Sequence, residues 1–453
     1  MSAMPETHST QIASLDEALI ANHRHDKQLF AELDALQREL GILSDDRPFS
    51  PFLRYQFMGR SLYERVAEAS EVLAGAFEKM ALAALEDQEI LGVLGLDENE
   101  ERFARMDPGY PGVCHSSRLD AFVAGGELKF LEYNGETPAG ITDQLQIEKV
   151  LSRIPEVREF MERHRHWLPR PHEKLLEALV SAYRDFGGRK DKPNIAIVDW
   201  KGVSTYSEFV VLAEYFRSQG HETVVGFPDE LDYDGSTLTL DGFEIDIFYK
   251  RVIIHELFER EAPDHPIFRA YEDGNLFMAN SFRSKVPHKK AGFAVLGDER
   301  FSRLFNSKEH EMIRRHLPWT RKVSDARTTY FGEDVGLLDY IRSGRERFVL
   351  KPNDDYGGSG IAIGWESTES EWDDAIETAL GSQYVVQERV RIERVPFPTY
   401  TEDEALMADL LIDLDPFIFR GKVEGALVRL SPQTLVNVAV GGGETALAVL
   451  EDA

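Results

Sequence analysis

A strand–helix–strand pattern near the middle of the chain constrains the fold more than any other sequence feature. The segment 194–198 ends in four consecutive apolar residues, as expected of a strand buried on both faces, and further short strands are predicted at 222–226 and 245–249. An amphipathic helix from 207 to 219 lies between the first two strands. Because parallel strands need a crossover connection, this order predicts a Rossmann-like α/β unit.

The regions on either side of this unit have different patterns. Before residue 95, apolar residues recur every three or four positions over 29–40 and again over 62–80, which predicts two amphipathic helices. Beyond residue 300 the chain mixes helices with short strands. The elements expected there are strands at 347–351 and 384–388, a helix at 371–380 between them, and a hairpin formed by 416–420 and 424–429.

Charge and cysteine content exclude several classes of partner. The 453 residues include 51 Lys and Arg against 80 Asp and Glu, which gives a net charge of −29. Proteins that bind nucleic acid usually present a basic field, so we expect no nucleic-acid partner and no anionic membrane partner. Cys114 is the one cysteine, and the N-terminus has no signal-peptide pattern. No apolar stretch is long enough to span a membrane, and these features together predict a cytoplasmic protein.

A candidate metal site lies in the segment 130–140, Phe-Leu-Glu-Tyr-Asn-Gly-Glu-Thr-Pro-Ala-Gly. Glu132 and Asn134 are two residues apart at the end of an apolar run. In a strand, residues at this spacing point to the same face. A carboxylate and an amide oxygen side by side are suitable ligands for Mg²⁺, which often shares its coordination with substrate phosphates. The segment therefore favours nucleotide chemistry.

Two further clusters carry positive charge. Lys351 ends the strand predicted at 347–351 and is followed by a loop that contains Gly357, Gly358 and Gly360. Such glycines allow backbone N–H groups to approach phosphate oxygens closely, although an ordinary hairpin turn explains the loop equally well. The pair Lys250-Arg251 ends a strand of the α/β unit, where such sheets usually place ligand groups, and either residue could bind a substrate carboxylate.

The order of these motifs resembles the circularly permuted ATP-grasp family, which includes the synthetase domain of glutathionylspermidine synthase. Arg118-Leu-Asp120 precedes Glu132-Tyr-Asn134, the Glu lies twelve positions after the Asp, and Gly135-Glu-Thr-Pro138 follows. The later motifs of the family correspond here to Lys308, to Lys351 with its glycine-rich loop, to Gln387-Glu388, and to Asn437 followed by Gly441–Gly443. The metal motif precedes the nucleotide lysines, which is the order that a permuted chain implies.

The resemblance implies a fold, cofactors and a role for each residue. The fold would be α/β (α+β): a permuted ATP-grasp core with a Rossmann-like domain and a helical N-terminal region. The cofactors would be ATP and Mg²⁺. Asp120, Glu132 and Asn134 would hold Mg²⁺, and Arg118 would stabilise the transferred phosphoryl group, unless it only forms a salt bridge with Asp120. The residues assigned to ATP are Lys308, Lys351, Gly357, Gly358, Gly360, Gln387, Glu388, Arg429 and Asn437.

The expected division of the chain follows the same resemblance. The parts are a helical region at 1–95, a first part of the ATP-grasp core at 96–190, the Rossmann-like domain at 191–295, and the nucleotide-binding lid with the return to the core at 296–453. The implied activity is ATP-dependent ligation of a small-molecule carboxylate to an amine through an acyl phosphate. A catalytically degenerate nucleotide-binding protein and an ATP-dependent phosphotransferase on the same fold are the alternatives.

Overall fold

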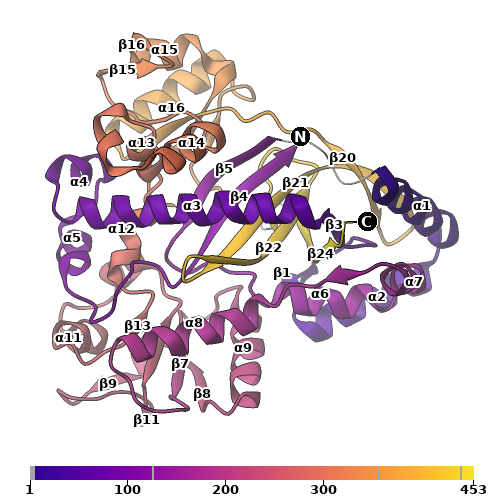
Figure 1. The fold of residues 1–453 in the computed structure, drawn as a ribbon, viewed down its shortest axis with the longest axis horizontal. Coiled ribbons are helices and arrows are strands. Elements are labelled where there is room, and N and C mark those ends of the chain that lie inside the picture. The colour runs from indigo at the N-terminus through magenta and orange to yellow at the C-terminus, as the bar shows by residue number, and fades with distance from the viewer. Residues whose placement is uncertain (1–5, 125–126, 356, 439–440, 453) are drawn as a thin grey trace.

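A central antiparallel sheet organises the computed structural model, which describes residues 6–124, 127–355, 357–438 and 441–452 (Figure 1). Its strands, in spatial order, are β23 (Gly443–Thr445), β22 (Lys422–Ser431), β21 (Ala405–Phe419), β4 (Ser116–Ala124) and β5 (Glu127–Asn134), with β20 (Val395–Tyr400) paired to the other end of β21. The predicted hairpin is confirmed as β21–β22. Its turn, Arg420-Gly421, has positive φ at both residues, which is typical of a two-residue hairpin connection.

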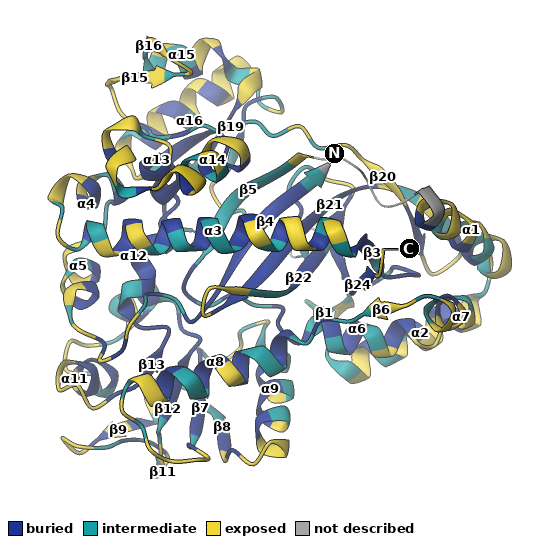
Figure 2. Ribbon diagram, in the orientation of Figure 1, coloured by how far each residue is buried: buried dark blue, intermediate teal, exposed yellow. Residues whose placement is uncertain are grey.

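The predicted parallel α/β unit is confirmed below the central sheet in Figure 1. The strand order is β13 (Met278–Ala279), β12 (Ile247–Lys250), β7 (Ile195–Val198) and β8 (Thr223–Gly226), and all neighbours are parallel. The helices α8 (Pro171–Asp185) and α9 (Tyr206–Ser218) pack against it. Every residue of β7 and β12 is buried, as Figure 2 shows, which explains the continuous apolar run in the sequence.

A smaller sheet lies above the central sheet in the same view. Its order is β14 (Thr320–Lys322), β19 (Tyr384–Glu388), β17 (Phe348–Pro352) and β18 (Ala362–Ile363), and α16 (Glu369–Gly381) packs on it. The expected pairing of 347–351 with 384–388 is confirmed, and it is antiparallel. The loop between β17 and β18 contains the predicted glycines, although Tyr356 of this loop lies outside the described residues.

The N-terminal helices are α1 (Glu6–His23), α2 (Lys27–Leu40) and α3 (Arg60–Ala84). Between the last two, β3 (Gln56–Gly59) pairs in parallel with β24 (Leu447–Leu450), which also pairs with β6 (His166–Trp167). Residues 56–59 of the N-terminal region are therefore paired with the last strand, and the region 1–95 contains strands as well as the expected helices.

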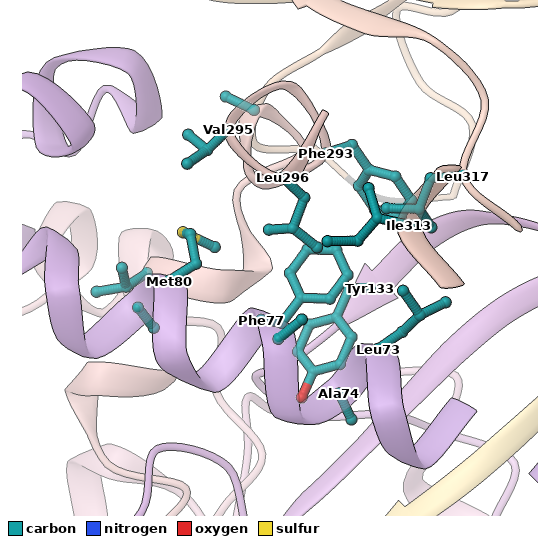
Figure 3. Packing of buried hydrophobic residues seen from close by; sticks show 14 of the residues in the cluster. Leu73, Ala74, Phe77, Met80, Tyr133, Phe293, Val295, Leu296, Ile313 and Leu317 are labelled. Carbon is teal, nitrogen blue, oxygen red and sulfur yellow. The ribbon is translucent and has the colours of Figure 1, made fainter. Parts of the chain in front are cut away.

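Helix α3 covers one face of the central sheet (Figure 1). Its inward residues Phe77 and Met80 are buried together with Tyr133 of β5 and with Phe293 of α13 (Ala291–Leu296), as Figure 3 shows. The Phe77 ring stacks on Tyr133 with the ring centroids 4.6 Å apart. Since side chains alternate between the faces of a strand, the neighbours of Tyr133 must point to the opposite face of the sheet.

Shorter elements complete the fold. The helices are α4 (Gln88–Leu94), α5 (Glu98–Arg105), α6 (Asp143–Leu151), α7 (Pro155–Arg163), α10 (Ile254–Arg260), α11 (Pro266–Glu272), α12 (Lys285–His288), α14 (Ser307–His316) and α15 (Leu337–Ser343), and the strands are β1 (Leu43–Ser44), β2 (Arg47–Pro48), β9 (Leu231–Tyr233), β10 (Leu238–Leu240), β11 (Phe243–Glu244), β15 (Arg327–Tyr330) and β16 (Glu333–Gly336). No helix within the described ranges is long and apolar enough to cross a bilayer.

Candidate active site

A cavity of about 670 Å³ lies on the face of the central sheet opposite α3. Residues of the central sheet and of the smaller sheet line it, together with loop residues that follow strands β7 and β12 of the parallel unit. Most of the site residues expected from the sequence lie in its wall. These are Arg118, Asp120, Glu132, Asn134, Arg251, Lys351, Gly357, Gly358, Gln387, Glu388, Arg429 and Asn437. Residues from four separate parts of the sequence therefore meet in one place.

The candidate metal ligands are brought together by the pairing of β4 with β5. Arg118 is the cross-strand partner of Asn134, and Asp120 is the partner of Glu132. Asn134 Nδ2 donates a hydrogen bond to Asp120 Oδ1 at 2.8 Å. Glu132 forms an ion pair with Lys290 at 2.9 Å. Two carboxylates and an amide on adjacent strands form a donor set that suits Mg²⁺.

Arginines on both sides keep Asp120 ionised. Arg118 donates from Nε and Nη2 to the two carboxylate oxygens of Asp120, at 2.8 and 3.1 Å, and Arg429 donates to it at 2.8 Å. Burial raises the pKa of Asp120, but the charges of the two arginines outweigh this effect and hold the pKa at about 2. The alternative considered for Arg118, a salt bridge to Asp120, is therefore present. It does not exclude a second role, because Arg118 also lines the cavity.

Arg429 is the centre of a buried acidic cluster. Its Nη2 lies 2.8 Å from Asp120 and 2.9 Å from both Asp413 and Asp415. All four groups project from β4, β21 and β22. Burial raises the pKa of Asp413 to about 6 against the opposing charge of Arg429. One guanidinium therefore neutralises part of a cluster of three carboxylates.

The smaller sheet supplies the expected lysine. Lys351 Nζ donates to Gln387 Oε1 at 2.8 Å, on the neighbouring strand β19. Burial lowers the pKa of Lys351 to about 8, although Glu132 acts in the opposite direction. Gly357 and Gly358 follow with φ of +70° and +83°, and a Cβ at either position meets no atom closer than 3.7 Å. The loop is thus open toward the cavity at both glycines.

Three expected site residues lie outside the lining of this cavity. Lys308 is on α14, 56% exposed, and pairs with Glu68 of α3. Gly360 packs against Pro352, since a Cβ there would lie 2.7 Å from its Cγ. Lys250 is fully buried and donates to the carbonyl oxygen of Val252. In the second glycine segment, Asn437 and Gly441–Gly443 belong to the described residues, whereas residues 439 and 440 lie outside them.

The sequence interpretation missed a buried network of ion pairs beneath the cavity. Lys285 Nζ lies 2.8 Å from Glu136 and 2.6 Å from Asp354, and Lys289 joins Asp354 to Glu100 of α5. Glu136 follows β5 and Asp354 begins the glycine-rich loop. The network therefore fixes these two loops relative to each other.

The same network contains a possible metal-ligand cluster, in which ligand atoms of Glu136, His288 and Asp354 lie within 4.8 Å of one another. The ammonium group of Lys285 already contacts both carboxylates of this set. The ammonium group of Lys285 therefore already supplies positive charge to this cluster. The sequence signal for these contacts was the pair Lys285 and Lys289, which lie four positions apart.

Comparisons with known proteins agree with this architecture. No protein-family model matches the chain. A protein of Frankia casuarinae, provisionally named glutamate–cysteine ligase 2-2, is 25% identical over 286 residues, which cover 59% of this chain and 30% of that protein. An uncharacterized protein of Mycobacterium bovis is 25% identical over 459 residues, covering 92% of this chain and 77% of that protein. The chain thus spans less than a third of the first relative's length.

A solved structure shows the fold more directly. The glutathione synthetase-like effector GSS30 of Globodera pallida superposes with a TM-score of 0.61 at 13% identity, over 93% of this chain and 96% of that one. The chain therefore has a mixed α/β fold like that of this glutathione synthetase-like effector.

Proposed function

We propose that this protein is an ATP-dependent, Mg²⁺-requiring ligase that joins a small-molecule carboxylate to an amine. The observation that carries the proposal is the meeting of Arg118, Asp120, Glu132 and Asn134 with Lys351 in one cavity. The name of the Frankia relative and the fold of the Globodera protein support the same reaction class. The product would be an amide, with ADP and phosphate released.

Asp120, Glu132 and Asn134 are the residues that would hold Mg²⁺. The ion, when bound, neutralises phosphate charge, which would otherwise be repelled by the carboxylates of this cavity. Lys290 and Arg429 keep Glu132 and Asp120 ionised and in position. No expected metal ligand therefore has to lose a proton before the ion binds.

Arg118 would stabilise the phosphoryl group during its transfer to the substrate carboxylate. A guanidinium fits the oxygens of a phosphoryl group in a bidentate manner. Its Nη1 donates to the carbonyl oxygen of Ala139 at 2.9 Å and its other nitrogens to Asp120. These contacts hold its position before the substrate arrives, which lowers the entropic cost of the transfer step.

The smaller sheet would bind the nucleotide. Lys351 would contact the phosphates, and the open loop at Gly357 and Gly358 would present backbone N–H groups to them. Gln387 and Glu388 would flank the adenine through the backbone of β19. Glu388 is held by a hydrogen bond of 2.6 Å from the hydroxyl group of Tyr330. Asn437 would complete the site from the far wall of the cavity.

Arg251 would bind the carboxylate substrate. It is 3% exposed, lines the cavity, and its Nε has no hydrogen-bond acceptor among the described residues. Its Nη1 is fixed by the carbonyl oxygen of Pro138 at 2.8 Å. Lys250, which the sequence pairs with Arg251, would act indirectly by holding Glu136 at 3.8 Å.

The same proposal includes a circularly permuted order of the ATP-grasp parts. It also includes the division of the chain into the four parts given above. The metal strands β4 and β5 precede the nucleotide strands β17 and β19 in sequence, yet they share a sheet with the late strands β21 and β22. This arrangement supports a permuted chain, since one structural unit is assembled from an early and a late segment.

The experiment is ATP consumption by the purified protein with Mg²⁺ and pooled amino acids, short peptides, glutathione and polyamines. ADP and phosphate should appear in step, with a product one water lighter than two substrates. Glu132→Gln should abolish the activity, whereas Glu402→Gln, an exposed residue away from the cavity, should not. ADP without free phosphate would instead identify a phosphotransferase, and the absence of ATP binding would contradict the proposal.

A further inference from the structure

A second pair of acidic residues lines the cavity at the edge farthest from the metal strand. Glu444 is on β23, where it is the cross-strand partner of Arg429, and Asp143 is the first residue of α6. The two side chains are direct hydrogen-bonding partners. Gln144 fixes this arrangement, because its amide group exchanges two hydrogen bonds with the backbone of Leu447 on β24.

One oxygen of this pair is buried without a partner. Glu444 is 6% exposed, and its Oε2 makes no hydrogen bond to any described residue. A buried carboxyl oxygen that lacks a hydrogen-bond partner is unfavourable in the folded protein. Since Glu444 lines the cavity, a ligand that carries an N–H group could supply the missing donor.

The charges around the pair are mixed, but only acidic groups contact it closely. Glu208 of α9 adds negative charge beside Asp143, and it is itself held by the backbone N–H of Ile141 at 2.8 Å and by Arg251 at 3.6 Å. The cations that face the pair are Arg118 and Arg429, and both are engaged with Asp120. Within the described ranges, this pair therefore has no cation of its own.

The position of the pair suits the second substrate. Glu444 is on the edge strand β23, whereas Glu132 and Asn134 are on the opposite edge strand β5. Four strand spacings of about 4.8 Å separate these edges by roughly 19 Å. Arg118 and Arg429 lie between them. A nucleotide at the Lys351 end and an acyl group at Arg118 would leave this far end of the cavity for the acceptor.

We propose that Asp143 and Glu444 form the amine subsite, in which the carboxyl pair holds the incoming primary ammonium group and then accepts its proton. This inference rests on the ligase function proposed above. The ammonium group would neutralise the negative charge of the pair, and it would donate a hydrogen bond to Glu444 Oε2. A neutral alcohol would not supply the charge, and an anionic acceptor would be repelled by Glu208.

The proton balance of the step is complete. The ammonium nitrogen carries three protons: one passes to the ionised member of the pair, one leaves with the phosphate, and one stays on the amide. The bond formed is carbon–nitrogen, and the bond broken is that between the acyl carbon and the phosphate oxygen. Burial, reinforced by the charge of Glu208, raises the pKa of Asp143 to about 7, and burial together with Asp143 raises that of Glu444 as well. At neutral pH one member can therefore accept a proton.

A binding experiment tests the subsite without knowledge of the natural substrate. Calorimetry on the full chain would compare n-butylamine, which is an ammonium ion at pH 7.5, with n-butanol. The wild type and Glu402→Gln should bind the amine, and Glu444→Gln and Asp143→Asn should bind it at least tenfold more weakly. Equal binding of the amine by wild type and Glu444→Gln, or amine binding no stronger than that of the alcohol, would overturn the proposal.

A turnover experiment separates this inference from the ligase function. Hydroxylamine is largely uncharged at neutral pH and captures an acyl phosphate without a base. With a carboxylate pool that supports ADP formation, Glu444→Gln should retain hydroxamate formation while amide formation falls at least tenfold. Equal loss of both products would overturn the assignment of the pair. Ammonium binding that depends on Glu444, in a wild type that forms neither ADP nor hydroxamate, would contradict only the ligase function.

Discussion

Replacing Arg429 with methionine should destabilise this protein more than almost any other single change to a cation. The side chain is 14% exposed, and its Nη2 contacts Asp120, Asp413 and Asp415 within 2.9 Å. Removing one partner of a buried ion pair typically costs about 3–5 kcal/mol, because the remaining charge stays buried without compensation. Here three carboxylates would remain, so we expect a cost at the upper end of that range at pH 8.

The matched control is Lys308→Met, which removes a lysine whose pair with Glu68 is 56% exposed on both sides. An exposed pair contributes about 0–1 kcal/mol, so this variant should unfold within about 1 kcal/mol of the wild type. The assay is urea unfolding of the ligand-free protein, followed by both circular dichroism and tryptophan fluorescence. Coincident transitions are required before a free energy is assigned, because a chain with several structural units need not unfold in one step.

The pH dependence gives a second test of the same reasoning. Burial already raises the pKa of Asp413 to about 6, and loss of Arg429 removes the charge that opposes this rise. The folded variant then holds protons that the unfolded chain, with ordinary carboxyl pKa values near 3.9, has released. Stability therefore falls as pH rises through this window, by up to about 1.4 kcal/mol per pH unit for each such proton. The loss of unfolding free energy caused by Arg429→Met should therefore be smaller at pH 5.5 than at pH 8. A penalty below about 1 kcal/mol at pH 8, or one that is unchanged at pH 5.5, would refute this account of the cluster.

Three further predictions concern Lys351, Glu132 and the glycine-rich loop. Lys351→Met should weaken ATP binding by about tenfold or more in calorimetry, whereas Lys308→Met should leave it within about twofold, because only Lys351 lines the cavity. Glu132→Gln should raise the Mg²⁺ concentration needed for half-maximal ATP binding by about tenfold, and an unchanged requirement would argue against this ligand. Gly360→Ala should lower the urea midpoint by the equivalent of about 1–2 kcal/mol, since Gly360 has φ of +66° and its added Cβ would lie 2.7 Å from Pro352.

Much of the site was predictable because its first four residues belong to one pair of adjacent strands. Arg118 with Asn134, and Asp120 with Glu132, are cross-strand partners on β4 and β5. Their spacing within each strand already determines which side chains share a face. The parallel unit at 195–250 was predictable for a similar reason, since continuous apolar runs mark strands that are buried on both faces.

The remaining contacts depend on pairing between distant segments, which a single sequence does not specify. Asp143 meets Glu444 only because α6 is fixed to β24 by Gln144, and Arg429 meets Asp413 only because of the register of β21 with β22. The lysine beside Glu132 is Lys290, which directly follows Lys289 of the buried network, whereas Lys308 is exposed on α14. Neither lysine belongs to a local motif that marks it as the partner of Glu132, so only the packing identifies it.

The charge of the cavity bears on both the proposed metal site and the proposed amine subsite. Ten Asp or Glu residues and four Lys or Arg residues line it among the described parts of the chain, in a protein whose net charge is −29. A free polyanion would be repelled by such a surface. The excess of carboxylates is explained if positive charge enters with the ligands: Mg²⁺ at Asp120 and Glu132, and an ammonium group at Asp143 and Glu444. Both ends of the cavity would then depend on cations, Mg²⁺ at one end and the ammonium group of the amine substrate at the other.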